Sequence, residues 1–168
     1  IPAAVVATLS QLNRWVADHR RVVLIDYADN NAFRYLQRMD FFERIGVTLN
    51  EDFSRRESGN AFVPIQEIPP GSATLNDEVA NRLAACVAET EDPFDDLYRL
   101  CQYSLGELIA NCRQHSGATG FTSAQYAEKK NMVRIGVADS GQGILSSFFT
   151  GGSPHYREDL TDESALAL

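Results

Sequence analysis

The chain has 168 residues, of which 44% are hydrophobic and 23% are charged, and this composition is typical of one ordinary globular domain or two small ones. The formal net charge of −8 is uneven: residues 1–72 carry eight basic and nine acidic side chains (net −1), and residues 73–168 carry seven and fourteen (net −7). So acidic a surface repels nucleic-acid phosphates, which argues against DNA or RNA as a partner. No apolar run approaches the ~20 residues that cross a bilayer, so no membrane span is expected in this segment. Three cysteines without a CxxC pair favour reduced thiols and a cytoplasmic location over a disulfide framework or a zinc site.

The first part of the chain is predicted to alternate helices with short strands. In chain order, the expected elements are a helix over 3–18, a strand over 21–27, a helix over 30–44, a loop over 50–60 and a strand over 61–68. Asn30 or Asn31 can cap the second helix, and Gly46 can end it. Pro64 cannot donate to a ladder, so the strand that contains it should be an edge strand or carry a bulge.

The sequence Ile68-Pro-Pro-Gly-Ser breaks any regular element, and we place a junction between two modules, 1–72 and 73–168, at this point. Beyond it, the expected elements are helices over 76–89 and 94–115, strands over 120–127 and 132–138, a helix or turn over 144–149, a loop over 151–154 and a helix over 161–168. Asp92 and Pro93 can open the long helix. Thr161, with Ser164 three residues later, can cap the last one, and Asp162 is an alternative cap.

Three polar residues share one face of the long predicted helix. Glu107, Asn111 and His115 are spaced by four in Glu107-Leu-Ile-Ala-Asn111-Cys-Arg-Gln-His115, and that face borders the apolar stripe. An amide carbonyl suits Mg²⁺, which prefers oxygen ligands, and a carboxylate can accept a proton from water. Taken alone, the same spacing also fits ordinary solvated side chains on a helix surface.

A second polar constellation follows the last predicted strand, at Asp139-Ser-Gly141-Gln-Gly143-Ile144. A carboxylate at a strand end can accept a hydrogen bond from the amine of a buried base. Glycines spaced by two allow positive φ and a close approach of the backbone to a ligand. On its own, the pattern D-x-G-x-G is also common in plain turns.

Together, a helix with E-x-x-x-N, two strands and D-x-G-x-G-I in this order resemble the GHKL ATPase superfamily of gyrase, heat-shock chaperone, histidine kinase and MutL. ELIANCRQHS resembles its N box and VADSGQGI its first glycine box, over residues 76–168. The resemblance implies ATP and Mg²⁺ as ligands. It also implies roles for single residues: Glu107 as catalytic base, Asn111 as Mg²⁺ ligand, His115 near phosphate, Asp139 at the adenine amine, Gly141 and Gly143 beside the base, Ile144 packed on it, and Ala110 and Ser116 as neighbours.

The implied fold is α/β: a small N-terminal α/β module followed by a Bergerat-type sandwich, with a helical layer on a mixed sheet. The family's second glycine box, G-x-G-L/I-G, is not found in the chain. We therefore expect a segment truncated before its phosphate clamp, and half of the positioning apparatus for phosphoryl transfer would lie outside it.

The first module loosely resembles the STAS fold of anti-sigma-factor antagonists, without the usual Asp-Ser phosphoacceptor pair. Asp26 and Asp29 are expected to be loop or strand-end residues, and His19 a cation at a helix end. The H-E/D-x-x-T/N-P motif of histidine autokinases is missing from the sequence.

The leading hypothesis is an ATP-binding regulatory protein, either a protein kinase or an ATPase of the histidine-kinase or anti-sigma-kinase type. Its partner would be a protein, as phosphoacceptor or anti-sigma-type regulator, and a homodimer stays open. The alternative is a non-catalytic nucleotide-sensing module, in which ATP only shifts a conformational equilibrium. A gyrase- or MutL-style ATPase that closes around DNA is disfavoured by the acidic charge.

Overall fold

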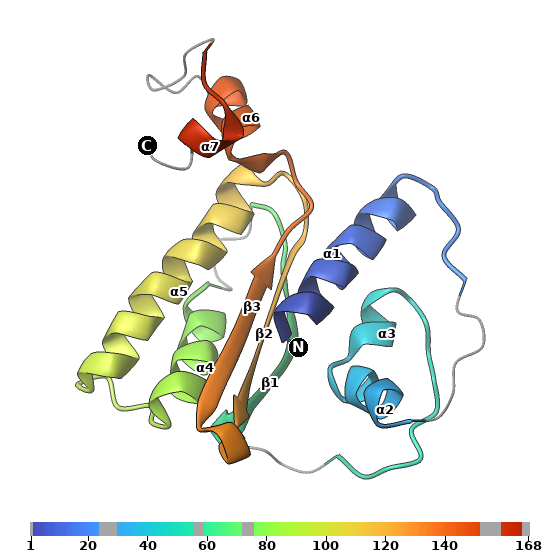
Figure 1. Ribbon diagram of the computed structural model, residues 1–168, viewed down its shortest axis with the longest axis vertical. Helices are drawn as coiled ribbons and strands as arrows, with labels where there is room; N and C mark the ends of the chain where they lie inside the picture. The colour runs from blue at the N-terminus through green and yellow to red at the C-terminus, as the bar shows by residue number, and fades with distance from the viewer. Residues whose placement is uncertain (1, 24–29, 56–58, 72–75, 152–158, 166–168) are drawn as a thin grey trace.

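The computed structural model describes residues 2–23, 30–55, 59–71, 76–151 and 159–165 (Figure 1). It is a mixed α/β structure with a small three-stranded antiparallel sheet. The elements are α1 (Pro2–Ala17), α2 (Asn31–Arg38), α3 (Phe41–Arg44), η1 (Gly59–Ala61), β1 (Phe62–Ile68), α4 (Asn76–Ala88), α5 (Asp96–His115), β2 (Gly120–Ala127), η2 (Glu128–Lys130), β3 (Met132–Ala138), α6 (Gly143–Thr150) and α7 (Asp162–Ala165).

The strands lie in the order β1-β2-β3, and both pairs are antiparallel. The predicted mixed sheet is therefore wrong for the described residues, which hold no parallel pair. β1 lies at an edge and its register shifts between Val63 and Gln66, as Pro64 predicted. The extra residue places Val63 and Ile65 in different cores, although they would share a face in a regular strand.

Helices cover both faces of the sheet (Figure 1). α4 and α5 pack on one face, and α1 packs on the other, with α2 and α3 beside it. Alternate residues of β2 enter the two cores, because side chains of a strand alternate between faces: Phe121 packs towards α1 and Ala124 towards α4 and α5. Gly136 permits the close fit of α1, since a Cβ there would stand 2.6 Å from the Ala3 Cα.

The sheet joins the two predicted modules. β1 comes from the first and pairs with β2 of the second, and α1 packs on β2 and β3. The predicted junction near residue 72 itself lies outside the described residues. It does not separate two independent cores, because the strand ladder and both main hydrophobic clusters draw on either side of it.

The predicted helix over 30–44 is interrupted. Asn30 caps α2 as predicted, accepting the backbone N–H groups of Ala32 and Phe33 at 3.0 Å each. The helix then stops because Asp40 adopts a left-handed φ of 62°, and α3 follows as a separate turn. The strand predicted over 21–27 is not seen at 21–23, which are irregular, and the rest of it lies outside the described residues.

The long helix starts later than predicted. Asp95 is its N-cap, accepting the Tyr98 N–H at 2.8 Å, and Asp92 instead accepts the Phe94 N–H in the preceding turn at 2.9 Å. The cap predicted for the last helix is confirmed, since Thr161 and Ser164 exchange backbone and hydroxyl hydrogen bonds.

None of the helices within the described ranges has the length and apolar character needed to span a bilayer.

Candidate functional site

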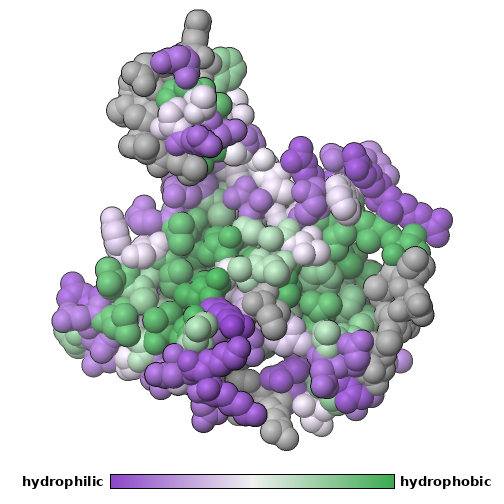
Figure 2. Space-filling view, in the orientation of Figure 1, coloured by the Kyte–Doolittle hydropathy of each residue, from purple (hydrophilic) through white to green (hydrophobic). Residues whose placement is uncertain are grey.

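A cavity of about 810 Å³ lies where the end of α5, the end of β3 and the start of α6 meet. This volume is within the range of about 300–1,000 Å³ that small-molecule sites occupy. Hydrophobic side chains gather on this face in front of α5 and β3, below the projecting α6–α7 segment (Figure 2). The lining residues are Leu105, Leu108, Asn111, Cys112, His115, Ser116, Ile135, Val137, Asp139, Gly143, Ile144, Ser147, Phe148 and Gly151.

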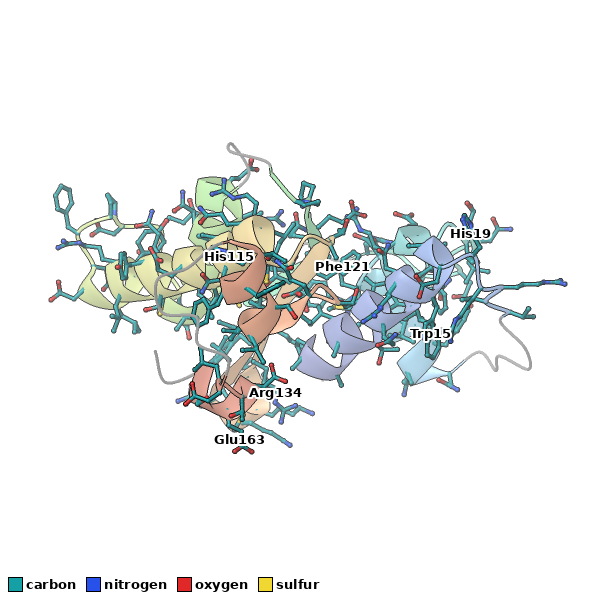
Figure 3. The ribbon with its side chains drawn as sticks, turned by 90° about the horizontal axis from the view of Figure 1, so that it is seen from above. Trp15, His19, His115, Phe121, Arg134 and Glu163 are labelled. Atoms are coloured by element: carbon teal, nitrogen blue, oxygen red, sulfur yellow. The ribbon has the colours of Figure 1, made fainter. Side chains whose placement is uncertain are left out.

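On the α5 side, the cavity receives two of the three predicted helix residues. Asn111 and His115 line it, and His115 lies beside α6 (Figure 3). Glu107 does not line it and is exposed. The helix geometry explains the difference, because each step of four residues rotates the position by about 40°. His115 is therefore turned furthest towards the buried Cys112 side and Glu107 furthest away from it.

On the loop side, Asp139 lines the cavity at the end of β3. Its Oδ1 accepts the backbone N–H of Gly141 at 2.9 Å, which folds the loop into a tight turn. The carboxylate keeps acceptor capacity for a ligand amine, because an ionised carboxylate can accept about four hydrogen bonds.

Gly141 does not line the cavity and instead fastens the loop to α5. A Cβ at this position would lie 1.9 Å from the carbonyl oxygen of Ser116. The next residue completes the contact: the Gln142 N–H donates to the same oxygen at 2.9 Å, and its Nε2 donates to the His115 carbonyl at 2.7 Å. Gly141 therefore acts on the site through the packing of the loop, and its predicted place beside a base stays a prediction.

The third wall comes from α6. Gly143 opens this helix with φ of 78°, a conformation that favours glycine, and Ile144 follows it into the cavity lining. Leu105, Ile135 and Val137 supply apolar surface opposite. The lining is therefore mostly apolar, with Asn111, His115, Asp139 and the serines as its polar groups.

Cys112 lies between the helix and the loop. Burial, which has the largest effect, the charge of Asp139 and a hydrogen bond between the two side chains together raise the pKa of its thiol to about 12. The thiol therefore stays protonated at neutral pH and is not a nucleophile. The thiol is a weak hydrogen-bond donor, and it lies next to the Asp139 carboxylate, which also lines the cavity.

No group of three or more His, Cys, Asp or Glu side chains in the described part of the chain is placed to hold a metal ion. Asn111 lines the cavity, and its side chain has a single carbonyl oxygen. That fits Mg²⁺ only as it binds with nucleotides, held largely by phosphate oxygens and water.

Sequence reasoning missed most of the apolar wall. Val133, Ile135 and Val137 alternate along β3 and pack towards α5, so period-two alternation was the signal for two lining residues. Ser147 and Phe148 gave no such signal, because their position depends on how α6 leaves the loop.

The other residues considered in the sequence lie apart from the cavity. His19 follows α1 at the opposite end of the molecule (Figure 3). Asp26 and Asp29 are outside the described residues.

Comparisons of the chain with protein-family models, with curated proteins and with solved structures give no match.

Proposed function

We propose that this protein binds an adenine nucleotide in the cavity between α5, β3 and α6. The observation that supports it most is the meeting of two constellations that two strands separate in the sequence. Asn111 and His115 from the helix share one cavity with Asp139, Gly143 and Ile144 from the loop.

The base would lie against the apolar lining with its amino group on Asp139. A carboxylate accepts from the N6 amine of adenine, whereas guanine presents a carbonyl oxygen at the corresponding position, which a carboxylate repels. Ile144 and Val137 would contact the ring faces. This arrangement favours adenine over guanine.

The phosphates would lie along the α5 wall of the cavity, beside Asn111 and His115. His115 can donate to a phosphate oxygen, and Asn111 can complete the shell of a Mg²⁺ ion held by the phosphates. Since the second glycine box is missing from the sequence, the segment supplies only part of a triphosphate clamp. We therefore expect weak binding, carried mainly by the base.

On this basis the protein is proposed to be an ATP-binding regulatory protein related to the GHKL superfamily, with a Bergerat-type arrangement of its second half. A protein kinase or ATPase acting with a protein partner, such as a phosphoacceptor or an anti-sigma-type regulator, fits this class. Glu107 would serve as base in that case.

The position of Glu107 favours a second candidate, a non-catalytic nucleotide sensor. The exposed carboxylate lies outside the cavity lining, so a general base at this position must first come within reach of the attacked phosphate. A sensor needs no such approach.

Titration calorimetry with ATP, Mg²⁺ and matched GTP tests the proposal. We expect Asp139→Asn to weaken ATP binding by about tenfold or more, since a hydrogen bond to a charged group contributes about 1.5–3 kcal/mol. Glu107→Ala should leave binding unchanged and abolish hydrolysis only if the kinase or ATPase hypothesis holds. Equal affinity for ATP and GTP, or an unchanged affinity in Asp139→Asn, would refute the assignment of the base site.

A further inference from the structure

Four large apolar side chains are exposed together at the start of α5 and in the turn before it. Phe94 is 87% exposed, Leu100 63% and Tyr103 70%, and Leu97 is also exposed. We call these four residues the α5 apolar face. Single exposed apolar residues are ordinary, whereas a group of large ones along one helix marks a site of interaction.

The helix cannot bury this face in its own fold. Tyr98, Leu105 and Ile109 point inward and are buried against α4 and the sheet. Leu100 and Tyr103 lie on the other side of the helix axis from these residues, by the 100° rotation per residue. The α5 apolar face also differs from the cavity, because none of its four members lines it.

The surroundings of this face are acidic. Residues 89–105 hold five carboxylates and one cation, Arg99, which gives a net charge of −4. Glu91, Asp92 and Asp96 are exposed, and within the described residues they make no salt bridge that would neutralise them. The charges are therefore available to a partner.

Charge decides which partner fits. Anionic lipid surfaces and nucleic acids are repelled by a face with this rim. A second copy of the chain is repelled too. In an antiparallel pair of α5 helices centred on Leu100, Asp96 of one copy lies towards the helical turn that contains Glu107 of the other. In a parallel pair, the same carboxylates of the two copies lie side by side. A cationic partner gains both the apolar contact and the charge attraction.

We propose that the α5 apolar face docks a cationic amphipathic helix of another protein, with leucine-like side chains along one stripe and lysine or arginine beside it. Phe94, Leu97, Leu100 and Tyr103 contact the stripe, and Glu91, Asp92 and Asp96 pair with the flanking cations. The proposal is independent of nucleotide binding.

The test uses fluorescence anisotropy of the whole 168-residue chain with a labelled helical peptide of about eighteen residues, made of leucine on one face and lysine on the other. The double substitution Leu100→Gln and Tyr103→Gln should weaken binding by about tenfold or more, since each side chain loses much of its apolar contact. The matched control, Val23→Gln, removes an exposed apolar side chain that follows α1 in the sequence, and it should leave the affinity unchanged.

A second variant tests the charge and does not depend on how the first one folds. Asp96→Lys keeps the apolar residues. It should weaken binding of the lysine peptide severalfold, and the affinity that remains should depend less on salt.

The proposal is overturned if the double variant binds the lysine peptide as the unaltered chain does, or if a peptide with glutamate in place of lysine binds equally well. It is also overturned if the face instead holds vesicles of anionic lipid, or if it drives a self-association in sedimentation that the double variant abolishes. All measurements are made without ATP, so a failure here leaves the nucleotide proposal untouched.

Discussion

Substitution of Gly141 by alanine probes the contact that holds the loop on α5. The new Cβ would stand 1.9 Å from the Ser116 carbonyl oxygen and 2.6 Å from the Ser116 Cα, so it meets backbone that cannot rotate away. The φ of Gly141 is not positive, so alanine meets no backbone strain at this position. The free-energy cost of the substitution therefore arises from this contact alone.

The magnitude follows from the distance that the loop must retreat. An ordinary contact begins at 3.4 Å, so a retreat of roughly 1.5 Å is needed, and this breaks the 2.9 Å bond from the Gln142 N–H to Ser116. Overpacking costs about 1–3 kcal/mol and the lost hydrogen bond about 0.5–1.5 kcal/mol. We expect a loss of about 2–4 kcal/mol in the free energy of unfolding, which lowers Tm by roughly 5–15 °C for a chain of this size.

The assay is thermal and urea denaturation followed by circular dichroism, with Gly106→Ala as the matched control. Gly106 lies inside α5, and its nearest neighbour would be 4.0 Å from the new Cβ, an ordinary contact. Alanine there should stabilise the chain by about 0.5–1 kcal/mol. If both variants were equally stable, the close packing of the loop on Ser116 would be refuted.

Three further outcomes follow from the structure. Gly136→Ala should lower Tm more than a surface alanine does and speed hydrogen exchange in α1, because its Cβ would stand 2.6 Å from the Ala3 Cα; unchanged exchange in α1 would contradict this packing. Asn30→Ala should lower the free energy of unfolding by about 1 kcal/mol, because it removes the cap of α2. Urea denaturation measures this loss against the control Asn31→Ala, and equal stability of the two variants would contradict the cap. The Cys112 thiol, whose raised pKa of about 12 favours the neutral form, should add stability that is complete below about pH 8.5 and falls as pH rises towards 12; rapid alkylation of folded Cys112 at pH 8 would contradict its burial.

Local sequence patterns were sufficient for most elements. The strands expected over 120–127 and 132–138 are β2 and β3, and the helix expected over 94–115 from its apolar stripe is α5. These features depend on neighbours within a few residues, which a sequence shows directly. The break of the helix at Asp40 could not be predicted, since a left-handed aspartate gives no compositional sign.

Relations between distant segments were harder to predict. Pairing of β1 with β2 across the Pro-Pro-Gly boundary ran against the expected division at residue 72, because proline and glycine report a break in local structure and not the end of a core. Antiparallel pairing depends on tertiary contacts that periodicity does not encode.

The polar half of the site was predictable and its apolar half was not. Asn111, His115 and Asp139 carry chemistry in their side chains, and the resemblance to the GHKL superfamily implied that they share one site; all three line the cavity. Phe148 and Val137 enter it through packing of α6 and β3, which only the structure places. Glu107 shows the limit of the spacing argument, because four residues exceed one turn of 3.6 residues and the positions therefore drift around the helix.

The proposed function depends on binding of an adenine base in the cavity between α5, β3 and α6. Photolabelling with an azido-substituted ATP, followed by mass spectrometry of the peptides, tests it most directly. We expect adducts confined to residues 105–116 and 135–151, suppressed by excess ATP and not by excess GTP. Labelling confined to other segments, or labelling of these segments that ATP does not suppress, would contradict it.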